Sequence, residues 1–194
     1  MAMPVRPPDP LPHGGWTIEM LDELPDDGQR YELIDGVVHV TPAPRELHQL
    51  VVGHVHYVLK QYLHGSAVGR AMISPSDVRR GDRTRNRVQP DVFVLRLIEG
   101  KRPPYPYAMS ELLLAVEVPS PSDPVYDYHT KRELYLANGV AEYWVLDADA
   151  RNLSRWCGAA DPGEVLSVRA EWHPAGMPQP LVLDLPAFFD DAVA

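Results

Sequence analysis

Hydrophobic residues recur with two different periods along the chain, and each period predicts one type of element. In 17–24 an apolar residue occupies every third position, which is typical of a short amphipathic helix. The runs 30–34 and 37–41 are rich in strand-forming residues and flank Asp35-Gly36, so they predict a hairpin. From 47 to 63 apolar residues recur every three or four positions, which predicts a long helix that packs along one face.

The rest of the chain predicts a sheet and a further helix. Strands are expected at 67–73, 77–80, 88–95 and 142–146, and a helix is expected at 127–138. The run 112–118 is apolar almost without interruption, so we expect a central strand that is buried on both faces. Apolar clusters from 153 to 189 predict a meander of antiparallel strands. The fold class is therefore mixed α/β, with a central sheet between two helical layers.

Length and composition limit how the chain is organised. With 194 residues, 45% of them hydrophobic, we expect one domain over 16–190 after a proline-rich, flexible arm at 1–15. The single cysteine, Cys157, excludes an internal disulfide and fits a reducing cytoplasm, and its side chain is expected in the core. No run approaches the roughly 20 apolar residues of a membrane-spanning helix, so we expect a cytoplasmic protein without a membrane role.

Charge gives two opposing indications about nucleic acids. The chain has 18 Lys and Arg against 27 Asp and Glu, a formal charge of −9, which argues against general binding to a polyanion. Five arginines nevertheless form a local basic strip, and we list them as candidate nucleic-acid-binding residues: Arg79, Arg80, Arg83, Arg85 and Arg87. The alternative is a solvated hairpin loop whose arginines are balanced by Asp77 and Asp82.

Four charged residues stand within or beside apolar runs, where an unpaired charge is costly. They are Glu32, Asp91, Glu117 and Lys131. Three carboxylates on strands of one sheet can converge on a point and supply the oxygen ligands that Mg²⁺ or Mn²⁺ prefers. Taken singly, each has an ordinary explanation as a turn, edge-strand or helix-surface residue. Their combination favours a metal site.

Several motifs together resemble a known family. They are Tyr31-Glu-Leu-Ile-Asp-Gly36, Gln89-Pro-Asp-Val-Phe-Val94, Val116-Glu-Val-Pro-Ser-Pro121, Lys131, Tyr135 and Gly139-Val-Ala-Glu-Tyr-Trp-Val-Leu-Asp147. In order and spacing they resemble the bacterial Uma-two family of restriction-endonuclease-like proteins, within the PD-(D/E)XK nuclease superfamily. The resemblance extends over roughly 17–189. It implies a restriction-endonuclease-like α/β fold, with an N-terminal hairpin and C-terminal antiparallel strands.

The resemblance also implies catalytic and metal-binding roles. Asp91 and Glu117, with the carbonyl of Val118 and with Glu32 directly or through water, would hold Mg²⁺ or Mn²⁺ for phosphodiester hydrolysis. The lysine that the superfamily carries two residues after the second acid is absent, because Pro119 stands there. Lys131 matches branches in which this lysine has moved to the following helix, where it would contact the attacking water or the phosphate.

Two further residues are candidates for supporting roles. Asp127 lies one helical turn before Lys131, so it either orients that lysine or, as we prefer, places a favourable charge at the helix start. His48 resembles a histidine position of the family and is expected near the Glu32 hairpin, where it would support the site or, as we prefer, have a helix-surface or partly buried structural role. The helix histidines lack the spacing of a zinc site.

The sequence thus predicts a Mg²⁺-dependent endonuclease that acts on DNA, with nucleic acid as its partner. Two alternatives stay open: a catalytically silent nuclease-fold module that binds nucleic acid or protein, and an enzyme that hydrolyses RNA or another phosphodiester. A homodimer is a further hypothesis, with the C-terminal part that contains Trp172 and Phe188-Phe189 as its surface.

Overall fold

The computed structural model describes residues 15–25, 27–41, 44–81, 85–119 and 125–194. In chain order the elements are α1 (Ile18–Asp22), β1 (Arg30–Ile34), β2 (Val37–Thr41), α2 (Glu46–Tyr62), β3 (Gly69–Ile73), β4 (Val78–Arg79), β5 (Arg87–Val88), β6 (Val92–Arg96), β7 (Tyr107–Ala108), η1 (Met109–Glu111), β8 (Leu112–Glu117), η2 (Tyr126–Lys131), α3 (Arg132–Ala137), β9 (Tyr143–Asp147), β10 (Asn152–Trp156), β11 (Glu164–Leu166), β12 (Arg169–Trp172), β13 (Leu181–Asp184) and α4 (Leu185–Val193). The predicted arm at 1–15 lies outside the described residues except for Gly15.

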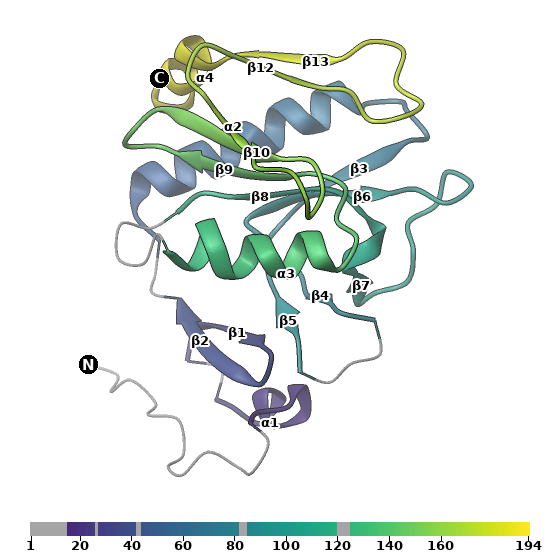
Figure 1. Ribbon diagram of the computed structural model, residues 1–194, viewed down its shortest axis with the longest axis vertical. Coiled ribbons are helices and arrows are strands. Elements are labelled where there is room, and N and C mark those ends of the chain that lie inside the picture. Colours follow the sequence, from purple (N-terminus) through teal and green to yellow (C-terminus); the bar gives the residue numbers. More distant parts are fainter. Residues whose placement is uncertain (1–14, 26, 42–43, 82–84, 120–124) are drawn as a thin grey trace.

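A six-stranded mixed sheet forms the centre of the molecule (Figure 1). Its strand order is β11-β10-β9-β8-β6-β3, with β8 and β9 parallel and the other neighbours antiparallel. Every residue of β8 is buried, which confirms the prediction of a central strand. The mixed α/β class is confirmed as well.

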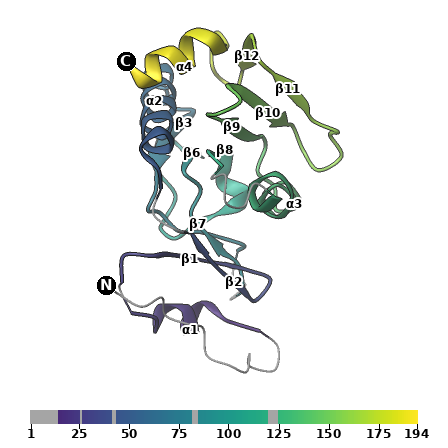
Figure 2. The ribbon, with the colours of Figure 1, turned by 90° about the vertical axis from the view of Figure 1, so that its left-hand side faces the viewer.

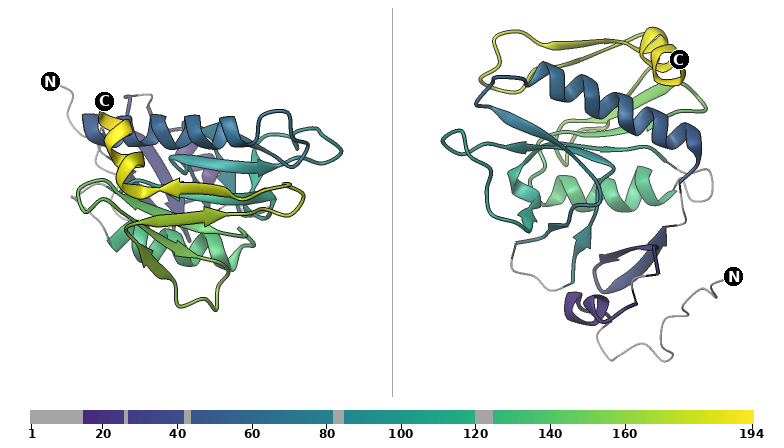
Figure 3. Two further views of the ribbon diagram at one scale, coloured as in Figure 1. Left: turned by 90° about the horizontal axis from the view of Figure 1, so that it is seen from above. Right: turned by 180° about the vertical axis from the view of Figure 1, so that it is seen from behind.

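Helices cover both faces of this sheet. Figures 2 and 3 show α2 and α4 on one face and α3 on the other. Alternate residues of the central strand pack into the two layers, because side chains of a strand point to opposite faces. Val116 packs in the core beneath α2, which Val55 and Leu59 also enter. Ala115 packs in the core beneath α3, together with Tyr135. The two predicted helical layers are present.

A second, five-stranded sheet lies at the lower end in Figure 1, in the order β2-β1-β5-β4-β7. Its β1–β2 hairpin spans the predicted residues, and Asp35 and Gly36 both have positive φ, 49° and 83°, as the tight turn requires. Trp16 and Leu33 form a small core with α1. The sequence predicted the hairpin, but not that it joins β5, β4 and β7 in a sheet separate from the central one.

The change from one sheet to the other occurs at Pro90-Asp91. The sequence predicted one strand over 88–95, whereas the structure has β5, which pairs with β1 and β4, and β6, which pairs with β3 and β8. Proline has no N–H to donate to a strand ladder, so pairing stops there and resumes with different neighbours. Asp91 consequently lies at the junction of the sheets.

The C-terminal part departs from the prediction in three ways. Residues 185–193 form a helix rather than the end of a meander, because the Asp184 side chain caps the helix at the N–H of Ala187 and a proline stands in its first turn. Trp172, Phe188 and Phe189 are buried against α2, so they do not form the expected dimer surface. Cys157 is exposed rather than in the core, since it follows the last residue of β10.

In the part of the chain that the structure describes, no helix combines the length and the apolar character needed to cross a membrane. The longest helix described, α2, has 17 residues.

Candidate active site

Two carboxylates meet where the sheets join. Asp91 immediately precedes β6 and Glu117 ends β8, and the two strands are antiparallel neighbours, so both side chains lie at the same end of the strand pair. The Asp91 N–H donates to Oε2 of Glu117 at 3.4 Å. The N–H of Val118 donates to Oδ2 of Asp91 at 2.9 Å. The structure therefore places these two predicted metal ligands next to each other, 4% and 1% exposed.

Lys131 enters the same cluster from η2, a single π-helical turn before α3. Its Nζ lies 2.9 Å from Oε1 of Glu117, 3.1 Å from Oε2 of Glu32 and 3.7 Å from Oδ1 of Asp127. The side chain is fully buried, and burial alone would lower its pKa. The surrounding carboxylates outweigh burial and raise the pKa of Lys131 well above its ordinary value, so the group stays cationic.

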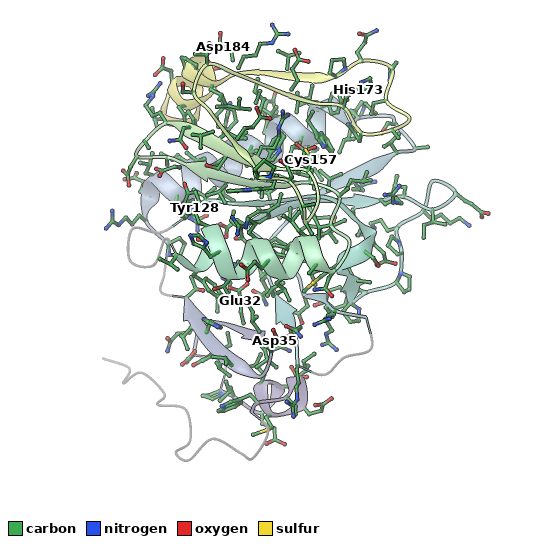
Figure 4. The ribbon with its side chains drawn as sticks, viewed as in Figure 1. Glu32, Asp35, Tyr128, Cys157, His173 and Asp184 are labelled. Atoms are coloured by element: carbon green, nitrogen blue, oxygen red, sulfur yellow. The ribbon has the colours of Figure 1, made fainter. Side chains whose placement is uncertain are left out.

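Glu32 reaches the cluster from the five-stranded sheet, between the β1–β2 hairpin and α3 in Figure 4. Its Oε1 accepts the N–H of Gln89 at 2.7 Å, and its Oε2 accepts the hydroxyl of Tyr126 at 3.3 Å and faces Lys131. The three carboxylates were expected on one sheet, but they come from two. Donors of the chain thus hold both Glu32 oxygens, as they do for Asp91 and Glu117.

A buried hydroxyl that the sequence analysis did not assign to the site also binds Glu117. Tyr135 of α3 donates to Oε1 of Glu117 at 3.0 Å, and its ring packs in the core. Tyr135 follows Lys131 by four residues, so the two share one face of the helical segment, and this spacing could have identified Tyr135 from the sequence. Burial raises the pKa of Tyr135 well above its ordinary value, so the hydroxyl keeps its proton and remains a donor.

Arg30 is a second unpredicted site residue, and it lies two positions before Glu32 on β1. Its Nη1 is 2.8 Å from Oδ1 of Asp91 and 3.4 Å from the carbonyl oxygen of Gln89. Burial alone would raise the pKa of Asp91, but Arg30, His48 and Lys131 outweigh it and lower the pKa. Residues two apart on a strand share a face, which was the sequence signal for Arg30.

His48, in the first turn of α2, lies beside Asp91 as expected for a supporting residue. Its Nδ1 is 2.8 Å from the carbonyl oxygen of Val118, and its Nε2 is 3.7 Å from Oδ1 of Asp91. A carbonyl oxygen can only accept, so Nδ1 carries a proton and the ring is fixed in place. The structure thus places His48 beside the cluster, and its role in the site stays a prediction.

Asp127 is in the first turn of η2, as we preferred, and its carboxylate also faces Lys131. Only 8% of the residue is exposed. Burial raises the pKa of Asp127 to about 6 although Lys131 opposes this shift. Both predicted roles, helix start and contact with Lys131, are therefore combined in one residue.

The cluster carries more negative than positive charge. Four carboxylates (Glu32, Asp91, Glu117 and Asp127) surround two permanent cations, Arg30 and Lys131. Burial and this excess, with Asp91 among the contributors, raise the pKa of Glu117 well above its ordinary value. An added cation would relieve the repulsion.

The donor set suits a magnesium-type ion. Among the described residues no group of three or more His, Cys, Asp or Glu side chains is arranged as a ready metal cage. Mg²⁺ does not require one, because it commonly binds one or two carboxylates and keeps several waters. Asp91 and Glu117 provide two such carboxylates, and the carbonyl oxygen of Val118, the third predicted ligand, lies 2.8 Å from Nδ1 of His48.

A cavity of about 600 Å³ opens beside this cluster; Asp91 and Val118 line it, whereas Glu117 and Glu32 lie behind its wall. Its walls include Arg30, His48, Asp91, Asp127 and Lys131, from both sheets, α2 and η2. The cluster is therefore reachable by a ligand from one side.

The predicted basic strip lies apart from this cavity. Arg79 and Arg87 face Asp77 at 3.8 Å each, Arg87 also pairs with Asp22, and Arg80 is 3.8 Å from Asp35. Arg85 is exposed, and Arg83 lies outside the described residues. None of the strip residues that the structure describes lines the cavity. These pairs favour the balanced-loop alternative for Arg79 and Arg87.

The fold and the buried acidic cluster define a mixed α/β protein of the restriction-endonuclease-like class. The model of the Uma2 family, described as "Putative restriction endonuclease", matches residues 18–188. The chain belongs to this family, and the resemblance noted from its motifs is confirmed.

A solved structure supports the fold. The chain is similar to the crystal structure of "a putative nuclease belonging to DUF820" from Anabaena variabilis, with 19% identity and a TM-score of 0.72. The similarity covers 91% of this chain and 98% of that chain. Comparison with curated proteins found no match.

Proposed function

We propose that this protein is a metal-dependent endonuclease that hydrolyses phosphodiester bonds in DNA. The observation that carries the proposal is the pairing of Asp91 and Glu117 beside Lys131, next to an open cavity that Asp91 and Lys131 line. The family description supports a nuclease and, as a restriction endonuclease, DNA as the substrate. Phosphodiester hydrolysis requires compensation of charge on the phosphate and activation of water, and this cluster contains groups suited to both.

Asp91, Glu117 and the Val118 carbonyl would hold Mg²⁺ or Mn²⁺, with Glu32 contributing through water. The ion would supply a Lewis acid and an activated water. Lys131 fixes the Glu117 and Glu32 carboxylates, and its third N–H, which faces Asp127 only at 3.7 Å, is available to the attacking water or to a phosphate oxygen. In the reaction a water oxygen bonds to phosphorus and the ester P–O bond breaks. The products are a phosphomonoester and a hydroxyl end.

The direct test is cleavage of supercoiled plasmid, and in parallel of single-stranded RNA, with Mg²⁺, with Mn²⁺ and with EDTA. We expect the wild type to nick DNA with metal, and Asp91→Asn, Glu117→Gln and Lys131→Ala to lose activity. Glu133→Gln and Lys60→Ala are matched controls, because Glu133 is exposed on α3 and Lys60 on α2. Cleavage of RNA alone would replace the substrate assignment.

A wild type as inactive as its variants, with Mn²⁺ binding that does not depend on Asp91, would overturn the enzyme assignment. The catalytically silent binding module would then take its place.

A further inference from the structure

Arg30 connects the acidic cluster to the cavity. As the first residue of β1 it lines the cavity, and 23% of its side chain is exposed against 5% for Asp91. Its Nη1 binds Oδ1 of Asp91 and the carbonyl oxygen of Gln89. One edge of the guanidinium thus neutralises a proposed metal ligand, while the side chain remains accessible to a ligand.

The guanidinium also has an unused donor. Its Nε is buried and has no hydrogen-bond partner among the described residues. Arginine presents its N–H groups as a planar fork that matches two oxygens of a phosphate. Arg79 and Arg87 also have an unpaired buried Nε, but neither lines the cavity. The exposed Arg45 also lines the cavity, and what distinguishes Arg30 is its direct bond to Asp91.

A cation on Asp91 would change the environment of Arg30. The guanidinium is always charged in a protein, and here it lies 2.8 Å from Oδ1 of Asp91. A divalent ion at Asp91 would then lie within a few ångströms of a fixed positive charge, and the two repel strongly at that distance. The repulsion is relieved if the guanidinium turns toward an anion in the cavity.

Resting on the function proposed above, we propose that Arg30 is a phosphate-binding residue that exchanges partners. When no metal is bound, the Arg30 guanidinium pairs with the Asp91 carboxylate. When a divalent cation binds to Asp91, the guanidinium turns to the phosphate of the nucleic acid beside the cleaved bond. Arg30 fits this role better than the other site cations. Lys131 is buried and uses two of its three N–H groups on Glu117 and Glu32, so one remains for the attacking water or a phosphate oxygen, and the Nδ1 of His48 is held by Val118.

The first test is calorimetric titration with Mn²⁺ in the absence of nucleic acid. Arg30→Gln removes the competing charge, so we expect Mn²⁺ to bind about tenfold more tightly than to the wild type. Arg30→Lys keeps the charge, and its Mn²⁺ affinity should stay within about twofold of wild type. Arg155→Gln is the matched control, because Arg155 is 22% exposed and pairs with Glu164 away from the cavity.

The second test measures binding of a labelled DNA duplex with phosphorothioate linkages, which slow cleavage, by fluorescence anisotropy. With Mn²⁺ present we expect Arg30→Lys to bind about tenfold more weakly than wild type, since lysine lacks the fork. In EDTA the wild type and Arg30→Lys should bind the duplex with equal affinity, because the side chain at position 30 then stays paired with Asp91. A purely structural Arg30 would give the same ratio in both buffers.

The outcomes separate this inference from the proposed function. If wild-type Mn²⁺ binding is lost in Asp91→Asn but is unchanged or weaker in Arg30→Gln, Arg30 does not compete with metal and only this inference fails. If Arg30→Gln does not fold, the duplex measurements on Arg30→Lys decide, and equal affinities with Mn²⁺ reject the proposal. If Asp91→Asn binds Mn²⁺ as well as wild type, both the proposed metal site and the exchange are rejected.

Discussion

The ammonium of Lys131 lies 2.9 Å from Oε1 of Glu117, although the two residues belong to different elements and Pro119 occupies the position where the related lysine is expected. The helical turn η2 returns along the end of β8 and brings the lysine back to the carboxylate. The charge that β8 lacks is thus supplied from a neighbouring helix.

Replacing Lys131 should separate catalysis from metal binding. Lys131→Ala removes the positive charge between Glu117 and Glu32, so we expect turnover to fall by about 10²-fold or more. Mn²⁺ affinity should not decrease, because the lost charge repelled the ion. Plasmid nicking rates and calorimetry measure the two quantities, with Lys60→Ala as control. A fall in Mn²⁺ affinity that accounts for the whole loss of turnover would contradict this prediction.

Stability should depend on pH through Asp127. Its pKa is about 6 in the folded protein against an ordinary 3.8, so the stability contributed by the protonated group is present below pH 4 and is lost as pH rises through 6. Between pH 4 and pH 7 we expect the free energy of unfolding of the wild type to fall by about 2 kcal/mol relative to that of Asp127→Asn. Urea unfolding in EDTA across this range measures the difference. If the difference in free energy of unfolding between the two proteins stayed constant from pH 4 to pH 7, the folded state would not shift the pKa of Asp127.

A divalent cation should stabilise the folded protein. Metal binding to the native state at about 100 times its dissociation constant contributes about 2.7 kcal/mol, which for a chain of this size raises Tm by roughly 5–10 °C. We expect this rise for wild type and for Glu133→Gln, and its absence for Asp91→Asn. Thermal unfolding with Mn²⁺ and with EDTA provides the comparison. The same rise in Asp91→Asn would place the ion elsewhere.

The basic strip should contribute unequally to DNA binding. Arg80 and Arg85 are the more available members, because Arg85 is exposed and Arg80 faces only the largely exposed Asp35. We expect Arg80→Gln with Arg85→Gln to reduce the slope of log affinity against log salt by about two. Arg79→Gln with Arg87→Gln is the comparison variant and should leave the slope nearly unchanged. Equal slopes in all three proteins would assign the whole strip to the balanced-loop alternative.

Local chemistry explains where the sequence-based predictions of structure were accurate. The hairpin at 30–34 and 37–41 was predicted to the residue, because Asp35-Gly36 determines the turn and the turn determines the register. The C-terminal helix was missed although its signals, Asp184 followed by Leu-Pro, are also local. There we extended the strand pattern of the preceding residues past a helix cap.

The site was predicted in part. Glu32, Asp91, Glu117 and Lys131 were identified because charges in apolar runs must be compensated, and the structure brings all four together. Arg30 and Tyr135 were not identified, because their roles depend on partners distant in the chain. Arg30 reaches Asp91, 61 residues away, through the position of β1 at the junction, and Tyr135 reaches Glu117 across the helix–sheet interface.

The sequence alone determined the types of most elements before the C-terminal helix, the central position of β8 and the charged residues that require partners. Periodicity, turn chemistry and the cost of burying charge are properties of short segments. Only the tertiary structure decided that two sheets rather than one carry the site, which donors hold each carboxylate oxygen, and that Arg30 rather than the arginine strip faces the cavity. These features depend on how strands pair after Pro90 and on where η2 packs, and both are set by contacts between segments far apart in the chain.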